Sequence, residues 1–191
     1  KAELIKKQGW EDCYLRALAW RGSEQMGVSA KRDDVHVAIA AWEWGDYFAD
    51  KMKGVRLMIA PWRRPAPDTA PANSKAAGLY MICTLSKHAA ENSGFNDALM
   101  LDWRGQIAEA TGANIFFVQD GEVHTPKADC FLNGLTRQTV IQMLKDMQIK
   151  VHERYIMPED LATFEQCWLT GTAAEVTPVG QIGDYMFEVG D

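Results

Sequence analysis

Lys75 stands where a proline-rich segment passes into a segment of helical composition. Four prolines from position 61 to position 71 oppose a helix before it, and residues 75–91 have the composition of a helix. The residues that follow include the apolar Met81, Ile82 and Leu85, and apolar surroundings remove water from an amine and make it a nucleophile. We therefore expect a catalytic amine at Lys75, with an ordinary solvated lysine in a first helical turn as the alternative.

Glu109 lies between a predicted strand that ends at Ala108 and a turn of small residues, Ala110-Thr111-Gly112. A carboxylate at the end of a strand can face a bound ligand and pair with a cation there. A solvent-facing side chain is the alternative, because most acidic residues are exposed. The sequence pattern leaves both interpretations open.

Two glycine-containing turns have the residues of an anion site. Gly134-Leu135-Thr136 leads into a predicted helix at 136–147, and Thr170-Gly171-Thr172-Ala173 follows a predicted strand. Free backbone N–H groups at a helix start or in a small, flexible turn bind phosphate or carboxylate. A plain helix cap or an ordinary turn is the alternative for each.

The sequence lacks the short patterns of several other kinds of site. The four histidines, at 36, 88, 124 and 152, have no spacing typical of metal ligands, and the four cysteines form no Cys-x-x-Cys pair. The patterns Gly-x-Gly-x-x-Gly, Gly-x-Ser-x-Gly and the P-loop pattern are also absent. We therefore expect no metal site, no disulfide framework and no dinucleotide-binding fold.

Strands with recurring helices between them predict a mixed α+β (α/β mixed) fold for these residues. Side-chain alternation from Cys13 to Trp20 predicts a strand with Tyr14 and Arg16 on one face. Further strands are expected at 35–44, 55–60, 98–101, 106–108, 114–118, 122–125, 151–156 and 164–169, with a hairpin turn at Asp120-Gly121 and helices at 75–91, 136–147 and from Pro158.

Composition and charge set limits on the partners. The chain has 191 residues, of which 47% are hydrophobic, and its net charge of −6 opposes nucleic-acid binding. The most apolar stretch, residues 35–44, is far shorter than the ~20 residues of a membrane helix. We expect no membrane segment, no secretory signal and a reducing, cytoplasmic setting. Because the chain begins with Lys1 and closes on Gly190-Asp191 without a recognisable element, we expect it to be part of a longer enzyme.

Several motifs follow one another in an order that indicates a family. They are Tyr14-Leu15-Arg16, Trp44-Gly45, Lys75-Ala76-Ala77-Gly78-Leu79-Tyr80, Glu109-Ala110-Thr111-Gly112-Ala113-Asn114-Ile115-Phe116, Asp120-Gly121 with Thr125-Pro126, Gly134-Leu135-Thr136-Arg137, and Gly171-Thr172-Ala173-Ala174-Glu175-Val176-Thr177-Pro178. Over nearly the whole chain, the sequence resembles the fold-type IV (class IV) pyridoxal phosphate aminotransferases, and most closely the branched-chain amino acid aminotransferases.

This resemblance implies roles around a pyridoxal 5'-phosphate cofactor. Lys75 would join the cofactor covalently through its ε-nitrogen and later carry a proton between the substrate Cα and the cofactor. Glu109 would bond the pyridine nitrogen and keep it protonated, so that the ring accepts the electrons left at Cα. Tyr80 would hydrogen-bond the phenolic oxygen. The phosphate would be held by Leu135, Thr136 and Thr172.

The resemblance also implies where the substrate binds. It assigns the α-carboxylate to Tyr14 and to the turn at Thr172 and Ala173. Arg16, on the same strand face as Tyr14, is then free to pair with the distal carboxylate of glutamate. One pocket could thereby accept an aliphatic and an acidic side chain in alternate half-reactions.

The remaining assignments concern the pocket wall and the assembly. Trp44 and Tyr80 would supply apolar wall. Val28 matches a residue that a loop of the neighbouring subunit inserts into the pocket in this family, which implies a homodimer or a higher homo-oligomer. The family fold has two domains, so residues 1–46 are expected to end a small N-terminal domain, 47–54 to connect, and 55–191 to form a larger, strand-rich cofactor-binding domain.

The expected reaction is transfer of an amino group between a branched-chain L-amino acid (Leu, Ile or Val) and 2-oxoglutarate. Related activities stay open: a D-amino acid or ω-amine transaminase, or aminodeoxychorismate lyase. An inactive, cofactor-free fragment or a binding module is the alternative without catalysis. Departures from the family pattern near the cofactor affect the expected substrate range, and they are Leu79, Ala110, Ala113 and Asn133.

Overall fold

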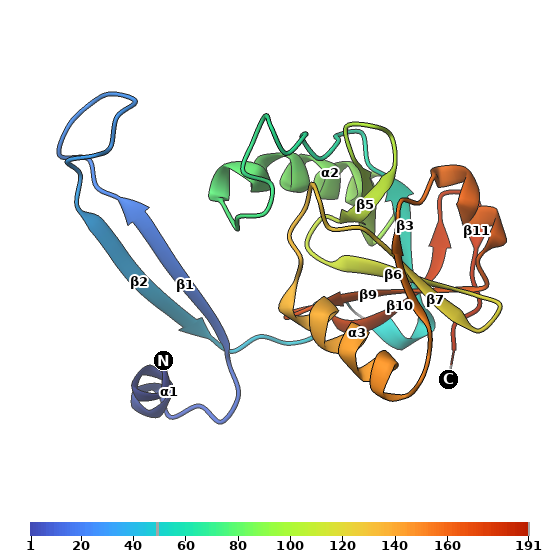
Figure 1. Cartoon of the computed structure of the whole chain (residues 1–191). Coiled ribbons are helices and arrows are strands. Elements are labelled where there is room, and N and C mark those ends of the chain that lie inside the picture. Colours follow the sequence, from blue (N-terminus) through green and yellow to red (C-terminus); the bar gives the residue numbers. More distant parts are fainter. Residues whose placement is uncertain (49, 191) are drawn as a thin grey trace. The chain divides into compact units, whose positions relative to one another are not determined.

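The computed structural model describes residues 1–48 and 50–190, and these residues form two compact units that divide between Tyr47 and Phe48 (Figure 1). The first unit contains a short helix, α1 (Ala2–Gln8), and a hairpin of β1 (Tyr14–Arg21) and β2 (Val35–Trp42). The two strands pair antiparallel along their full length. Both predicted strands of this unit are confirmed, and most residues of the apolar strand β2 are exposed in this unit taken by itself.

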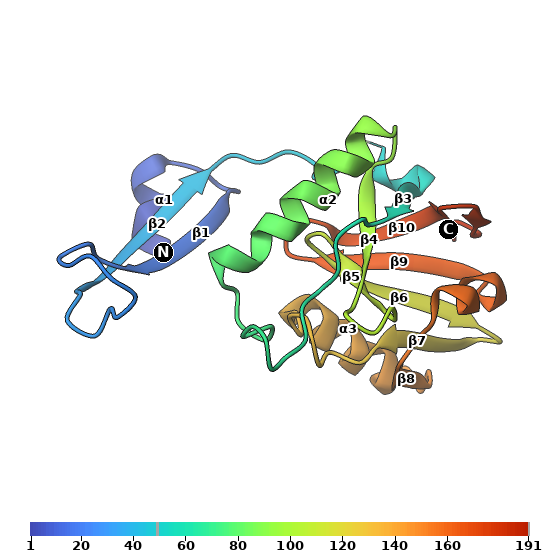
Figure 2. The same ribbon diagram turned by 90° about the horizontal axis from the view of Figure 1, so that it is seen from above.

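The second unit is built on a nine-stranded mixed sheet. The strand order is β5-β4-β3-β10-β9-β6-β7-β8, and β11 pairs with β10. Figure 2 shows β10, β9, β6, β7 and β8 following one another across the unit. The strands are β3 (Val55–Ile59), β4 (Asp97–Leu101), β5 (Ile107–Ala110), β6 (Asn114–Gln119), β7 (Glu122–Pro126), β8 (Val151–Arg154), β9 (Gln166–Gly171), β10 (Glu175–Ile182) and β11 (Tyr185–Met186).

The sheet curls, so that its two edges approach each other. In β5, the first strand in the order, Ile107 donates its backbone N–H to the carbonyl of Ile156, just after the last strand, at 2.8 Å. The N–H of Ala110 in β5 also donates to the carbonyl of Ala113, just before β6, at 2.8 Å. These bonds link strands that are far apart in the pairing order, and they bring Glu109 and Asn114 close to each other.

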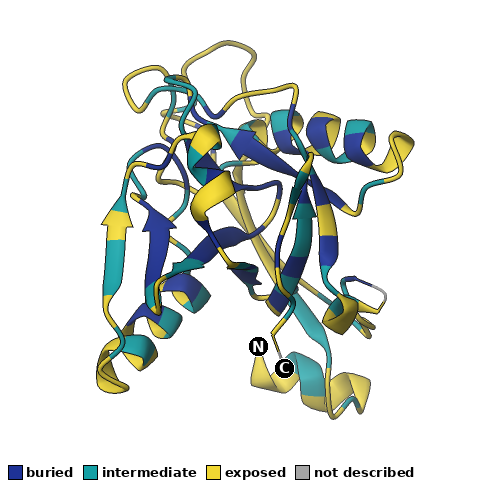
Figure 3. Ribbon diagram, turned by 90° about the vertical axis from the view of Figure 1, so that its right-hand side faces the viewer, coloured by how far each residue is buried: buried dark blue, intermediate teal, exposed yellow. Residues whose placement is uncertain are grey.

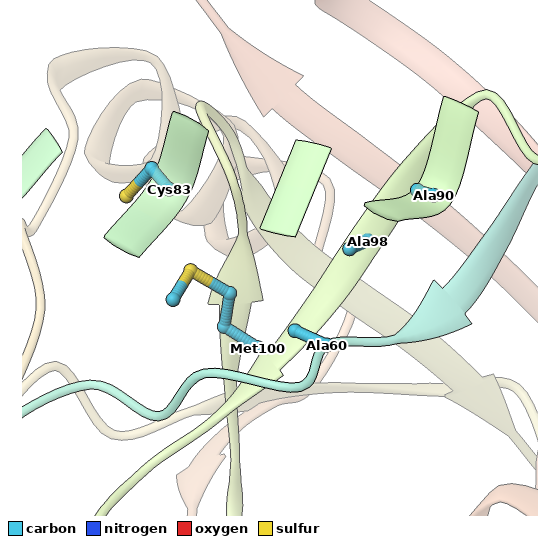
Figure 4. Close-up of a cluster of buried hydrophobic side chains, with 5 residues drawn as sticks. All are labelled: Ala60, Cys83, Ala90, Ala98 and Met100. Atoms are coloured by element: carbon cyan, nitrogen blue, oxygen red, sulfur yellow. The ribbon is translucent and has the colours of Figure 1, made fainter. Parts of the chain in front are cut away.

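Two long helices pack on the sheet and fix the segments at its edge. α2 (Tyr80–Asn92) covers β4 through a cluster in which Cys83 and Ala90 of the helix meet Ala98 and Met100 of the strand (Figure 4). α3 (Leu135–Asp146) packs through Ile141 against Phe116 and Val123. Figure 3 shows that buried residues gather in strands of the second unit, whereas loops and outer helix faces are largely exposed.

Three 3-10 turns complete the second unit, namely η1 (Lys51–Lys53), η2 (Ala77–Leu79) and η3 (Pro158–Thr163). The predicted short helix from Pro158 is therefore present in 3-10 form. The predicted hairpin at Asp120-Gly121 is confirmed, and both residues have positive φ, 52° and 73°, as a tight hairpin turn requires.

The α+β fold class is confirmed, and several boundaries differ from the sequence-based expectation. The helix expected from Lys75 begins with η2 at Ala77, after a stretch that follows the prolines without helical structure. Strand β10 was not expected, because its Pro178 and Gly180 weaken the strand pattern. Pro178 nevertheless pairs with Trp168 of β9, where this antiparallel pairing meets the parallel pairing with β3.

No helix within residues 1–48 and 50–190 is both long enough and apolar enough to cross a lipid bilayer.

Candidate active site

A cavity of about 410 Å³ lies in the second unit, a volume within the range of small-molecule sites. Segments far apart in the sequence line it: the loop before α2, β5, the start of β6, the N-terminus of α3 and the turn between β9 and β10. The lining includes every cofactor-binding residue expected from the sequence. These residues are Lys75, Tyr80, Glu109, Leu135, Thr136 and Thr172.

Lys75 is held by the loop before α2, and its amine contacts a phenol. Its Nζ donates a hydrogen bond to Tyr80 Oη at 2.8 Å and lies 5.4 Å from the centre of that ring. The side chain of Lys75 is exposed, and so are Met81 and Leu85. The expectation that apolar neighbours desolvate this amine is therefore wrong, because those neighbours are themselves in contact with solvent.

Glu109 lies inside β5, rather than after a strand that ends at Ala108. The strand runs on because Glu109 and Ala110 pair with Met100 and Leu99 of β4. Only 9% of Glu109 is exposed, and the residue lines the cavity. The solvent-facing alternative is thereby excluded.

Two side chains approach the carboxylate of Glu109. Oε1 lies 3.5 Å from Arg64 Nε in a buried ion pair, and Oε2 accepts a hydrogen bond from Asn114 Nδ2 at 3.3 Å. Burial raises the pKa of Glu109 from 4.5 to about 8, although the positive charges of Arg64 and Lys75 oppose the rise. A protonated ring nitrogen in the cavity would favour the ionised carboxylate and form a strong, charge-assisted hydrogen bond with it.

The N-terminus of α3 and the turn after β9 supply donors for an anion. Gly134 caps α3, and its carbonyl accepts the N–H of Gln138 at 3.0 Å. The first N–H groups of a helix have no acceptor inside the helix and carry partial positive charge. In the described part of the chain, Thr170 Oγ1 is buried and has no hydrogen-bond partner, and it lines the same cavity as Gly171 and Thr172. These N–H and hydroxyl groups suit a phosphate.

The polar groups of the cavity fit the cofactor expected from the sequence. The amine suits an aldehyde, and the phenol suits a phenolic oxygen. The buried carboxylate suits a ring N–H, and the cluster of backbone N–H groups suits a phosphate. The unpartnered hydroxyl of Thr170 and the raised pKa of the Glu109 carboxyl group are the two observations that indicate a ligand there. A phosphate would give the Thr170 hydroxyl a partner, and a cationic ring nitrogen would stabilise the ionised carboxylate of Glu109.

Sequence reasoning gave no role to Arg64 or Asn114, and it included Thr170 only as part of a possible anion-binding turn. All three residues line the cavity. Arg64 lies among prolines in what reads as an exposed loop, yet it is 4% exposed. Its backbone N–H donates to the carbonyl of Leu101 at 2.8 Å and holds the loop beside β4. Asn114 falls within a quoted motif, and the short turn between β5 and β6 brings it to Glu109. A proline-flanked arginine and a strand asparagine carry no local signal for such contacts.

Tyr14, Arg16 and Trp44 lie together in the first unit. The rings of Tyr14 and Trp44 are 4.7 Å apart, and the Arg16 guanidinium lies 6.0 Å from the centre of the Tyr14 ring. Val28, in the loop between β1 and β2, is fully exposed. The expected substrate contacts of these four residues, and of Ala173 in the turn after β9, stay predictions.

The tertiary structure gathers two histidines that sequence spacing does not connect. His124 of β7 and His152 of β8 are paired across the strands with ring centres 4.7 Å apart, and Glu122 lies beside them. Cations of the chain already contact this group. Arg154 Nε donates to His124 Nδ1 at 3.0 Å, and Lys150 pairs with Glu122 at 2.9 Å.

A second group with metal-ligand side chains combines Asp102, Asp129 and Cys130. Arg104 bridges the two carboxylates, at 2.7 Å from Asp102 and 3.0 Å from Asp129. In this group too, the acidic charge is paired with a cation of the chain itself.

Comparison with known proteins shows which family shares these features. The family described as amino-transferase class IV matches residues 2–182. A probable branched-chain-amino-acid aminotransferase of Rickettsia bellii is 41% identical over 180 residues, which cover 94% of this chain and 61% of that protein.

Two solved structures have the same fold. A T.th. branched-chain amino acid aminotransferase, complexed with N-(5'-phosphopyridoxyl)-L-glutamate, aligns with a TM-score of 0.91 at 35% identity, over 97% of this chain and 61% of that one. The branched-chain aminotransferase of Thermoproteus uzoniensis, with norvaline, aligns with a TM-score of 0.94 at 33% identity, over 99% and 64%. The chain thus spans about 60% of the length of the relatives that it matches.

Proposed function

Since the chain belongs to the class IV aminotransferase family, we propose that it transfers an amino group between a branched-chain L-amino acid and 2-oxoglutarate, with pyridoxal 5'-phosphate as cofactor. One observation carries the proposal. Lys75 and the buried carboxylate of Glu109 line a single cavity together with the N-terminus of α3. Relatives named branched-chain aminotransferases support the choice of substrate.

Bound pyridoxal phosphate supplies an aldehyde for the amine and a ring that takes up the electron pair left at the substrate Cα. Lys75 would provide the amine for covalent attachment, and its free amine would then carry the proton from the substrate Cα to the cofactor. The hydrogen bond to Tyr80 Oη holds Lys75 Nζ in place. The hydroxyl group of Tyr80 can in turn donate to the phenolic oxygen of the cofactor. Glu109 would hold the ring nitrogen of the bound cofactor and keep it protonated, because a cationic ring nitrogen favours the ionised carboxylate.

Binding of the phosphate uses groups that are already in position. The first N–H groups of α3, at Leu135 and Thr136, and the hydroxyl of Thr172 line the cavity. The positive end of the α3 dipole favours the doubly charged phosphate. The unpartnered hydroxyl of Thr170 is a further donor.

For the substrate, we retain the assignments made from the sequence. Tyr14 and the turn at Thr172 and Ala173 bind the α-carboxylate, and Arg16 pairs with the distal carboxylate of glutamate in the second half-reaction. Trp44 contributes apolar wall for the branched side chain. Within the first unit, the proximity of Arg16 and Trp44 to Tyr14 supports a common substrate surface.

We also propose a homodimer in the cytoplasm. The fully exposed Val28 is the residue that the family resemblance assigns to a neighbouring subunit's pocket. The four cysteines are free thiols, as a reducing compartment favours. Molar mass by light scattering tests the assembly, and a mass of one chain excludes the dimer.

A panel of amino donors tests the reaction. The protein, expressed from its complete reading frame, is incubated with pyridoxal phosphate, 2-oxoglutarate and either L-leucine or D-alanine, and separately with aminodeoxychorismate. We expect glutamate formation with L-leucine and its loss in Lys75→Ala. Glu109→Gln should lower the rate by several orders of magnitude while cofactor binding persists, because an amide cannot hold the ring nitrogen protonated. Turnover of D-alanine or aminodeoxychorismate alone contradicts the proposal in favour of that activity.

A further inference from the structure

The side chain of Asn114 connects two parts of the cavity that lie on different elements. Nδ2 donates to Glu109 Oε2 at 3.3 Å and to the carbonyl of Leu132 at 3.0 Å. Oδ1 accepts the backbone N–H of Gly134 at 3.2 Å. Asn114 is 5% exposed, and these three bonds use both amide hydrogens and the amide oxygen.

The three hydrogen-bond partners of the Asn114 amide lie on different elements around the cavity. Glu109 lies in β5 and is the acceptor for a cationic ring nitrogen, whereas Gly134 is the N-cap of α3, next to the N–H groups suited to a phosphate. Leu132 belongs to the loop that leads into α3. One rigid amide therefore sets the distance between the carboxylate and the start of the helix.

The packing at Gly134 is an independent observation of the same link. A Cβ built on Gly134 would lie 2.5 Å from Asn114 Oδ1, too close for any side chain. The φ of Gly134 is −61°, which other residues also adopt, so the backbone conformation does not require glycine. The close approach of the Asn114 amide does.

We propose that Asn114 is a positioning residue that holds the carboxylate of Glu109 toward the ring nitrogen and, through the same amide, fixes the phosphate-binding start of α3. This role rests on the proposed function. By donating to Oε2, the amide favours the ionised form of Glu109. An apolar side chain at 114 would leave this buried oxygen with one donor fewer.

A double-mutant cycle tests the link to Glu109. Dissociation constants for pyridoxal phosphate are measured by absorbance for the apo forms of the wild type, Asn114→Ala, Glu109→Gln and the double variant. We expect Asn114→Ala to weaken binding by about tenfold or more, as for loss of a buried hydrogen bond to a charged group. In the Glu109→Gln background, the same substitution should change the free energy of cofactor binding by less than half as much as it does in the wild type.

Thr125→Val is the matched control. Thr125 is fully buried in β7, and its Oγ1 donates to the carbonyl of Ile115 at 2.8 Å, but it does not line the cavity. This variant loses a buried hydrogen bond and should lower the melting temperature without changing cofactor affinity. Equal effects of Asn114→Ala in both Glu109 backgrounds, or unchanged affinity in Asn114→Ala, would overturn the role of Asn114.

A measurement on the unaltered residue covers the case in which Asn114→Ala does not fold. The side-chain amide resonance of Asn114 in the apo protein should shift with pH at the midpoint of Glu109 ionisation, and the shift should disappear in Glu109→Gln. A resonance that is insensitive to pH between 5 and 9 would show that the amide does not sense the carboxylate. If the wild type binds no pyridoxal phosphate, the proposed function itself fails; if it binds and these tests fail, only the role of Asn114 does.

Discussion

At the scale of single residues, Glu109 has an unusual environment for an acidic side chain. Its carboxyl group is buried in β5, where desolvation raises its pKa to about 8, and the nearby Arg64 at 3.5 Å only partly offsets that rise. A buried acid whose charge is only partly offset by its neighbours is costly for the fold. Such a cost is expected at a ligand site, where the missing partner arrives with the ligand.

This environment predicts a pH dependence of stability in the apo protein. Because the folded-state pKa of Glu109 is about 8 and its ordinary value is 4.5, the folded state binds more protons than the unfolded state between these values. The free energy of unfolding should therefore fall as pH rises through this window, by up to about 1.4 kcal/mol per pH unit. Urea unfolding at several pH values measures it.

Glu109→Gln isolates this contribution. Burial also raises the pKa of Asp97, but Asp97 is present in both proteins, so the difference between their stability curves reports on Glu109. The variant should lose the part of the slope that Glu109 causes. Parallel curves for the two proteins from pH 5 to pH 9 would show that Glu109 titrates normally.

Among the elements, β6 and α3 are joined at the site by one close approach. Gly134→Ala should displace the Asn114 amide, since its Cβ would lie 2.5 Å from Oδ1. We expect a loss of about 1–2 kcal/mol of stability from the broken Gly134 N–H contact. In the Asn114→Ala background the same substitution should cost much less, because the obstructing oxygen is gone. Denaturant unfolding of the four proteins gives both values, and equal costs in the two backgrounds would refute the clash.

The packing of α2 on β4 gives a second element-scale prediction. Ala90 and Ala98 are both fully buried at this contact, which leaves no room for a larger side chain (Figure 4). Ala90→Leu should destabilise the protein by about 1–3 kcal/mol through overpacking. His88→Leu, on the exposed part of the same helix, is the control and should change stability by less than about 0.5 kcal/mol. A stable Ala90→Leu variant would mean that the helix is loosely packed.

The local pattern predicted most elements of the second unit but not their contacts. β6 and α3 appear in the sequence as an apolar run and an amphipathic stretch, so both were predictable. The end of β5 was not, because Glu109 and Ala110 belong to the strand only through their pairing with β4. Arg64 reaches Glu109 from 45 residues away because its loop is held beside β4, which no local pattern encodes. Asn114 is only 5 residues from Glu109, and the short turn between β5 and β6 brings the two together.

At the scale of the whole molecule, the expected cofactor site is contained in the second unit, and the expected substrate residues are divided between the units. The cavity, its amine, its carboxylate and the N-terminus of α3 all lie after Phe48. Tyr14, Arg16 and Trp44 belong to the first unit. Cofactor binding and substrate selection should therefore respond to different substitutions: changes at Arg16 should raise the KM for 2-oxoglutarate and leave the affinity for the cofactor unchanged.

Chemical trapping of the cofactor tests the central claim most directly. The protein is mixed with pyridoxal 5'-phosphate, reduced with borohydride and digested, and the modified lysine is identified by peptide mass mapping. We predict one stoichiometric adduct on Lys75, the lysine whose Nζ lies 2.8 Å from Tyr80 Oη, and none in Lys75→Ala. An adduct on a different lysine, or no adduct in the wild type, would contradict the account.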